Sequence, residues 1–157
     1  RGVAHQEADG TDMVTVWIAM NDATAENGCL MVQPQTGAQA MLPHCPLDQT
    51  AIPAAHLDAG RAVPVPVRAG GVVLLHPLTP HAAGPNRTDG FRWSFDLRYQ
   101  RSGQPTGRAH FPAFPVRGAP PPDWREMRDR WLAARLTCAG APHVPIHRWT
   151  STSPHCA

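Results

Sequence analysis

The sequence predicts an all-β core, either a sandwich or a barrel, followed by one C-terminal helix. Short runs of β-branched and aromatic residues recur over the first two thirds of the chain, and turn-forming residues separate them. The 157 residues include 18 prolines and 13 glycines, which favours a loop-rich protein over a helical bundle. This length suits a single domain with a real hydrophobic core.

Five segments are typical of strands. Residues 13–20 are the clearest, because the run is apolar, β-branched and too short for a typical helix. Residues 62–67 contain prolines, which cannot donate to a neighbouring strand, so we expect this segment at a sheet edge. The remaining three are residues 29–34, 72–76 and 92–99.

The segment 92–99 alternates cleanly between polar and apolar residues. Because successive side chains of a strand point to opposite faces, Trp93, Phe95 and Leu97 share one face and Arg92 opens the other. We expect the apolar face to pack against the rest of the fold and the Arg92 face to line a pocket.

A helix is predicted after residue 123. Asp123 follows three prolines and suits the N-cap position, and Gly140 marks a stop. Between them, apolar residues recur at helical spacing: Trp124, Met127, Trp131 and Ala134. We therefore expect a partial jelly-roll core in residues 1–118, with residues 119–157 forming a helix and tail packed on it.

Charge and cysteine usage narrow the functional classes. The net charge is only +2, and the fourteen basic residues, all arginines, are scattered, which argues against a nucleic-acid partner. No apolar stretch reaches the ~20 residues of a membrane span. The four cysteines match no zinc spacing, so we expect free thiols in a reducing cytoplasm. Phosphate-loop and nucleophile-elbow motifs are also absent from the sequence.

Three residues could bind one metal ion. His5 and Glu7 are two apart and would share a face in extended backbone, and the distant His81 would complete two histidines and a carboxylate. This set leaves one face of an octahedral ion open, as in non-haem Fe(II) oxygenases. A 2-oxo acid bound there would need a cation for its far carboxylate, and Arg92 follows His81 by eleven residues.

Each of these residues taken alone also has an ordinary structural interpretation. His5 and Glu7 would fit a solvated loop, His81 a loop or core histidine, and Arg92 a surface ion pair. Asp9 is a second candidate carboxylate, although it is less well placed than Glu7 on an extended strand. The order and context of the residues together are what favour the metal site.

The motifs HQE, TVWIAMNDATAENGCLMVQP and VRAGGVVLLHPLTPHAAGPNRTDGFRWSFDLRY resemble the phytanoyl-CoA dioxygenase family of Fe(II)/2-oxoglutarate oxygenases. The resemblance covers most of residues 3–135. It implies a double-stranded β-helix, or jelly roll, with iron at its mouth. It also implies that His5, Glu7 and His81 are the metal ligands, that Arg92 binds the C5 carboxylate of 2-oxoglutarate, and that Trp17 lies near this co-substrate or in the core.

The resemblance implies an oxygenase that couples oxidative decarboxylation of 2-oxoglutarate by O2 to hydroxylation of a small-molecule or acyl substrate. Glu7, Ala83 and the missing upstream sequence favour an alternative, an inactive or truncated relative that binds a small ligand. Glu7 replaces the usual aspartate, Ala83 a common serine, and Gly71 an aspartate. The acceptor substrate and the oligomeric state are not indicated by the sequence.

The chain begins at Arg1, just before the first candidate ligand, and the family would by then have completed several strands and helices. We therefore expect an N-terminally truncated jelly roll. Strands that pair with upstream sequence would expose edges and apolar surface, so the chain should be marginally stable or prone to associate.

Overall fold

The computed structural model describes residues 12–34, 41–47, 50–106, 112–117, 120, 123–140 and 149–156. Their strands are β1 (Met13–Ala19), β2 (Leu30–Val32), β3 (Cys45–Pro46), β4 (Thr50–Ala51), β5 (Val63–Val65), β6 (Val72–Leu75), β7 (His81–Ala83) and β8 (Ser94–Gln100). Two short 3-10 helices, η3 (Ala54–His56) and η4 (Ala59–Arg61), precede β5, and one helix, α1 (Trp124–Ala139), lies near the C-terminus.

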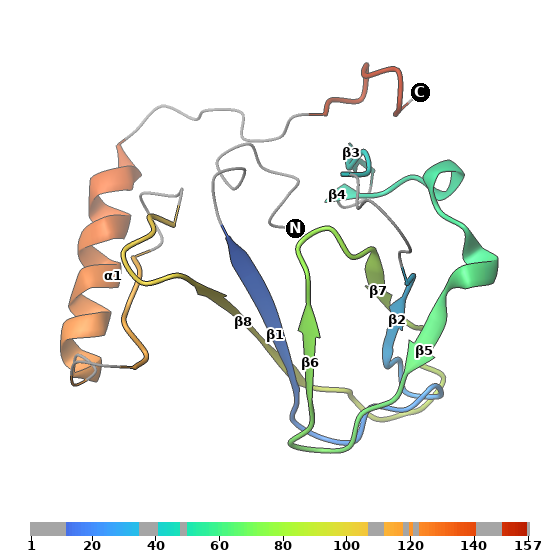
Figure 1. The fold of residues 1–157 in the computed structure, drawn as a ribbon, viewed down its shortest axis with the longest axis horizontal. Helices are drawn as coiled ribbons and strands as arrows, with labels where there is room; N and C mark the ends of the chain where they lie inside the picture. The colour runs from blue at the N-terminus through green and yellow to red at the C-terminus, as the bar shows by residue number, and fades with distance from the viewer. Residues whose placement is uncertain are drawn as a thin grey trace. The chain divides into compact units, whose positions relative to one another are not determined.

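The strands form a jelly roll built on two three-stranded sheets (Figure 1). One sheet has the order β6-β1-β8 and the other the order β5-β2-β7, while β3 and β4 pair separately. From β5 onward, consecutive strands alternate between the two sheets, as expected for jelly-roll connections. The predicted fold class is thereby confirmed.

The five predicted strands are all present: four are shortened by one to three residues, and the fifth begins two residues later and ends one residue later than predicted. The strand containing Pro64 lies at the edge of its sheet, as its missing N–H requires. The sequence did not predict β3, β4 or β7. These strands have only two or three residues, which is too few to show a periodic pattern, and pairing with a neighbour defines them.

The core lies between the two sheets. Thr15, Trp17 and Ala19 alternate along β1 and are buried on its inner face. Leu75 joins them from β6 of the same sheet, and Leu30 joins them from β2 of the opposite sheet. Burial therefore alternates along MVTVWIA, and one face of β1 lies in the core.

The chain divides into two compact units. One comprises Met13–Tyr99 with Trp149–Ala157, and the other comprises Arg1–Asp12 with Gln100–Arg148. In the second unit, Asp123 caps α1 as predicted, its side chain accepting a hydrogen bond from the Arg125 N–H. The division expected at residue 118, with the tail packed on the core, stays a prediction.

Helix α1 buries none of its side chains. Its contacts within its own unit include the Arg130 guanidinium, which lies 4.9 Å from the ring centroid of Phe114. Among the described residues, none of the helices has the length and apolar character needed to cross a membrane.

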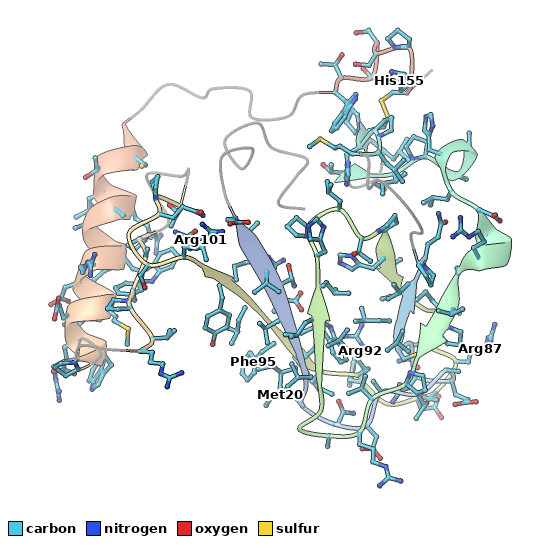
Figure 2. All side chains as sticks on the ribbon, in the orientation of Figure 1. Met20, Arg87, Arg92, Phe95, Arg101 and His155 are labelled. Carbon is cyan, nitrogen blue, oxygen red and sulfur yellow. A yellow bond between two sulfur atoms is a disulfide. The ribbon has the colours of Figure 1, made fainter. Side chains whose placement is uncertain are left out.

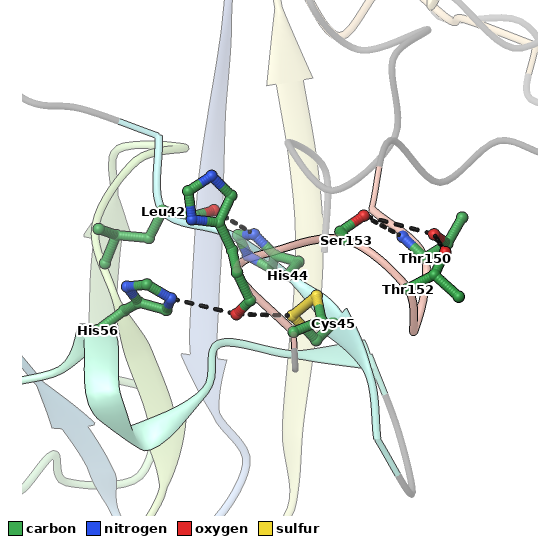
Figure 3. The surroundings of a disulfide bond; sticks show 9 residues. Leu42, His44, Cys45, His56, Thr150, Thr152 and Ser153 are labelled. Atoms are coloured by element: carbon green, nitrogen blue, oxygen red, sulfur yellow. Dashed lines mark hydrogen bonds between the residues drawn. A yellow bond between two sulfur atoms is a disulfide. The ribbon is translucent and has the colours of Figure 1, made fainter.

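The expectation of four free thiols is wrong. Cys45 and Cys156 form a disulfide, with a Cα–Cα distance of 5.5 Å (Figure 3). Around it, His56 Nε2 donates to the carbonyl oxygen of His155 (3.3 Å), and the rings of His44 and Trp149 are 5.6 Å apart. Cys29 and Cys138 are free. The partners are 111 residues apart, and cysteine spacing does not reveal such a pairing.

The start of β8 also differs from the prediction. The strand begins at Ser94, so Arg92 precedes it instead of opening it. Trp93, Phe95 and Leu97 do share one face, but that face is exposed in the described structure and does not pack against the rest of the fold. Alternation defines two faces, whereas only the surrounding elements decide which face is covered.

Candidate co-substrate and metal site

Trp17 is the buried residue of the candidate site. Its side chain is 3% exposed and lies on the inner face of β1, where Trp17 pairs with Val73 of β6. The Arg92 guanidinium lies over this ring, 5.4 Å from the centroid, within the range of a cation–π contact. The structure therefore brings together the two residues that the sequence assigned to the co-substrate, while Trp17 is also a core residue.

Two further groups orient Arg92. Its Nε donates to the carbonyl oxygen of Gly28 (3.1 Å), and its Nη1 donates to Ser94 Oγ (2.8 Å). Figure 2 shows Arg92 on the inner side of the sheet, away from Phe95. Since β8 begins at Ser94, the hydroxyl is held by the strand that follows the arginine.

The groups that Arg92 contacts among the described residues, a carbonyl, a hydroxyl and an indole ring, carry no charge. In the part of the chain that the structure describes, no carboxylate forms an ion pair with it, and its Nη2 donates to no described residue. A half-buried guanidinium cannot lose its proton, so burial without a counter-ion costs free energy. This arrangement suits an anion, and a carboxylate matches the guanidinium fork best.

Gly28 lets the backbone approach Arg92 closely. Its φ is +86°, and a Cβ at this position would lie 2.8 Å from the Gly84 carbonyl oxygen. The backbone N–H of Gly84 in turn donates to the carbonyl oxygen of Cys29 (2.8 Å). Only glycine suits both the positive φ and this spacing, so Gly28 aims its carbonyl at Arg92. The sequence patterns did not identify Gly28 and Ser94 as partners of Arg92.

Substituting Gly28 tests this geometry. Gly28→Ala is expected to lower the free energy of unfolding by about 1–3 kcal/mol, because it combines an unfavourable φ with a backbone clash. Urea denaturation measures the change. Gly70→Ala is the matched control, since Gly70 also has a positive φ of +78° but nothing within 4 Å of its added Cβ. An equal decrease in the free energy of unfolding for the two variants would show that the close approach of Gly28 to Gly84 does not affect stability.

His81 is the one predicted metal ligand among the described residues. It begins β7, pairs with Val32 of β2, and is exposed. Its Nδ1 donates to the Thr79 carbonyl oxygen, 2.9 Å away. This bond sets the tautomer with Nδ1 protonated, so the lone pair of Nε2 is available to a metal. The imidazole thus has a backbone hydrogen-bond partner of the kind that metal-binding histidines commonly have, which is compatible with the predicted role.

The other two predicted ligands, His5 and Glu7, lie outside the described residues. Their convergence with His81 therefore stays a prediction. Within the described ranges, no three histidine, cysteine, aspartate or glutamate side chains gather in a way that could hold a metal ion.

Comparison with known proteins identifies relatives of this chain. The chain is 36% identical over 90 residues to a "Probable phytanoyl-CoA dioxygenase" of Caenorhabditis elegans, covering 53% of this chain and 29% of that protein. It is 33% identical over 98 residues to "Phytanoyl-CoA dioxygenase, peroxisomal" of Rattus norvegicus, covering 57% and 29%. The chain thus spans less than a third of the length of these two relatives.

A solved structure and a family model complete the comparison. The crystal structure of EvdO2 from Micromonospora carbonacea var. aurantiaca complexed with 2-oxoglutarate matches with a TM-score of 0.52 and 30% identity. The match covers 57% of this chain and 38% of that one. The family model described as phytanoyl-CoA dioxygenase (PhyH) matches residues 2–94, well over half of the sequence. The chain belongs to the phytanoyl-CoA dioxygenase family.

Proposed function

We propose that this chain is the catalytic part of an Fe(II)- and 2-oxoglutarate-dependent dioxygenase, which hydroxylates a small-molecule or acyl substrate. The observation that carries the proposal is the Arg92 guanidinium, half-buried over Trp17 with only neutral partners among the described residues. The far carboxylate of 2-oxoglutarate would supply the missing negative charge.

In this proposal His5, Glu7 and His81 hold the iron. Two histidines and one carboxylate are the donor set of non-haem Fe(II) oxygenases, and the protonated Nδ1 of His81 leaves Nε2 for the metal. When bound, Fe(II) supplies the activation of O2, coupled to decarboxylation of 2-oxoglutarate to succinate and CO2. The protein's own residues orient the co-substrate and keep water from it.

Arg92 and Trp17 perform that orientation. The Gly28 carbonyl and the Ser94 hydroxyl fix the guanidinium plane, so that Nη2 can donate to a carboxylate without rearrangement. The buried indole shields one side of the pair from water, which strengthens an ionic contact. The EvdO2 match, a structure whose title names bound 2-oxoglutarate, supports the co-substrate assignment.

The relatives' names refer to phytanoyl-CoA, an acyl thioester, which favours an acyl or other small-molecule acceptor. The cytoplasmic location expected from the sequence depended on free thiols. The Cys45–Cys156 disulfide means that cysteine usage no longer favours a reducing cytoplasm, because disulfides are rare in reducing compartments.

Anaerobic titration with Fe(II), followed by 2-oxoglutarate, tests the function. We expect stoichiometric iron binding and then a charge-transfer band in the visible range when the co-substrate chelates the metal. A protein that binds 2-oxoglutarate but shows no iron and no band would be the inactive ligand-binding relative. If neither iron nor 2-oxoglutarate binds, the proposal is wrong.

His81→Ala tests the metal ligand separately. Loss of a residue that only hydrogen-bonds a metal ligand lowers metal affinity by roughly 10–100-fold, so loss of the ligand itself should lower Fe(II) affinity by more. His76→Ala is the control, because His76 is also exposed and its Nδ1 accepts a hydrogen bond from the Leu78 N–H. Iron affinity measured by competition with a chelator should fall for His81→Ala alone. Unchanged affinity in that variant would remove His81 from the site.

A further inference from the structure

The backbone around Arg92 lies just outside the regular pairing of two neighbouring strands. β1 ends at Ala19 and β8 begins at Ser94, so Arg92 precedes the strand that the sheet holds. One further bond, from the Met20 N–H to the Trp93 carbonyl oxygen (2.9 Å), continues the contact past the end of β1. Backbone N–H and C=O groups beside a half-buried side chain need partners, so whatever holds this stretch also places the guanidinium.

The side chain of Asn21 holds the backbone on both sides of Arg92. Its Oδ1 accepts a hydrogen bond from the Trp93 N–H (2.8 Å), and its Nδ2 donates to the Phe91 carbonyl oxygen (2.9 Å). These two partners fix the orientation of the amide, because a backbone N–H can only donate and a carbonyl oxygen can only accept. The amide thus offers the donor and the acceptor that a neighbouring strand would offer at this point.

The turn that begins with Asn21 also contacts the guanidinium itself. Its last residue, Gly28, accepts the bond from Arg92 Nε through its carbonyl oxygen (3.1 Å). Between the two ends, Asn27 fastens the turn, because its Nδ2 donates to the Asp22 carbonyl oxygen (2.8 Å). A single turn therefore contacts Arg92 twice, holding the neighbouring backbone at its first residue and the side chain at its last.

We propose that Asn21 is a positioning residue for co-substrate binding, which fixes the place and direction of the Arg92 guanidinium. This inference rests on the proposed function, in which Arg92 binds the far carboxylate of 2-oxoglutarate. A contact between a guanidinium and a carboxylate depends on orientation as well as charge, so a shift of the arginine backbone weakens it. Asn21 acts through Arg92 and is not itself a ligand of 2-oxoglutarate or of iron.

Titration of the Fe(II)-loaded chain with 2-oxoglutarate, followed by the charge-transfer band, tests this role. We expect Asn21→Ala to weaken 2-oxoglutarate binding by roughly 5- to 50-fold, because two hydrogen bonds are lost, and to leave Fe(II) affinity unchanged. Asp22→Ala is the matched control in the same turn. The Asp22 side chain also bonds a distant backbone group, accepting from the Ala69 N–H (2.8 Å), and this variant should bind 2-oxoglutarate like the wild type.

A double-mutant cycle with Arg92 separates positioning from a general loss of structure. If Asn21 acts through Arg92, adding Asn21→Ala to Arg92→Ala should change 2-oxoglutarate affinity by less than ~2-fold, the usual error of such cycles. Asn21→Asp is a second variant of the same size. Its carboxylate still accepts from the Trp93 N–H but cannot donate to the Phe91 carbonyl oxygen at neutral pH, so it should also weaken 2-oxoglutarate binding. Circular dichroism should show every variant folded.

The failure of this inference is distinguishable from the failure of the proposed function. If Arg92→Ala weakens 2-oxoglutarate binding while Asn21→Ala and Asn21→Asp bind like the wild type, only the role of Asn21 is wrong. A full effect of Asn21→Ala in the Arg92→Ala background would also overturn that role, since Asn21 would then act elsewhere. Wild-type binding by Arg92→Ala would overturn the co-substrate assignment and the role of Asn21 together.

Discussion

Replacing Arg92 with alanine is expected to weaken 2-oxoglutarate binding to the Fe(II)-loaded protein by roughly 30- to 4000-fold. The reason is that loss of one partner of a desolvated Arg–carboxylate pair costs about 2–5 kcal/mol. Trp17 shields this guanidinium, and no described carboxylate substitutes for the ligand. Affinity for Fe(II) alone should barely change. Titration of the charge-transfer band with 2-oxoglutarate measures the effect.

The conservative variant separates charge from geometry. Arg92→Lys should recover only part of the affinity, because an ammonium group keeps the charge but cannot bond Gly28, Ser94 and a carboxylate in one plane. Arg87→Ala is the matched control, an exposed arginine in the preceding loop. If Arg92→Ala binds 2-oxoglutarate as tightly as the wild type, Arg92 has no role in co-substrate binding.

Opening the Cys45–Cys156 disulfide is expected to lower the free energy of unfolding by about 2–5 kcal/mol. The bond closes a long loop between residues 111 apart, so it removes much conformational freedom from the unfolded chain. The described C-terminal residues also contact the rest of their unit through the His56–His155 hydrogen bond and the His44–Trp149 ring pair. Urea denaturation of oxidised protein, reduced protein and Cys156→Ser measures the loss.

The controls for this prediction use the other cysteines. Cys138→Ser should change stability little, because Cys138 is a free, partly exposed residue of α1. Cys156→Ser should no longer respond to a reductant, and peptide mapping by mass spectrometry should find the Cys45–Cys156 cross-link only in the parent chain. Identical denaturation midpoints with and without reductant would contradict a stabilising disulfide.

Local patterns predicted several elements because their causes are local. The apolar, β-branched run of β1 forms a strand, and Asp123 caps α1 through a bond to a residue two positions away. By contrast, β7 has three residues and exists because β2 lies beside it, so its start at His81 could not be predicted. The partners of Arg92 could not be predicted either, since the Gly28 carbonyl is 64 residues away in sequence.

The sequence by itself determined the family motifs, the alternating strands, the proline-bearing edge strand and the candidate residues His5, Glu7, His81, Arg92 and Trp17. Periodicity, capping and side-chain chemistry depend on near neighbours in the chain. The tertiary structure alone decided that Arg92 lies over Trp17 with neutral partners, that Cys45 pairs with Cys156, and that the Phe95 face of β8 is left open. Each of these depends on segments far apart in sequence, whose pairing is set by the whole fold.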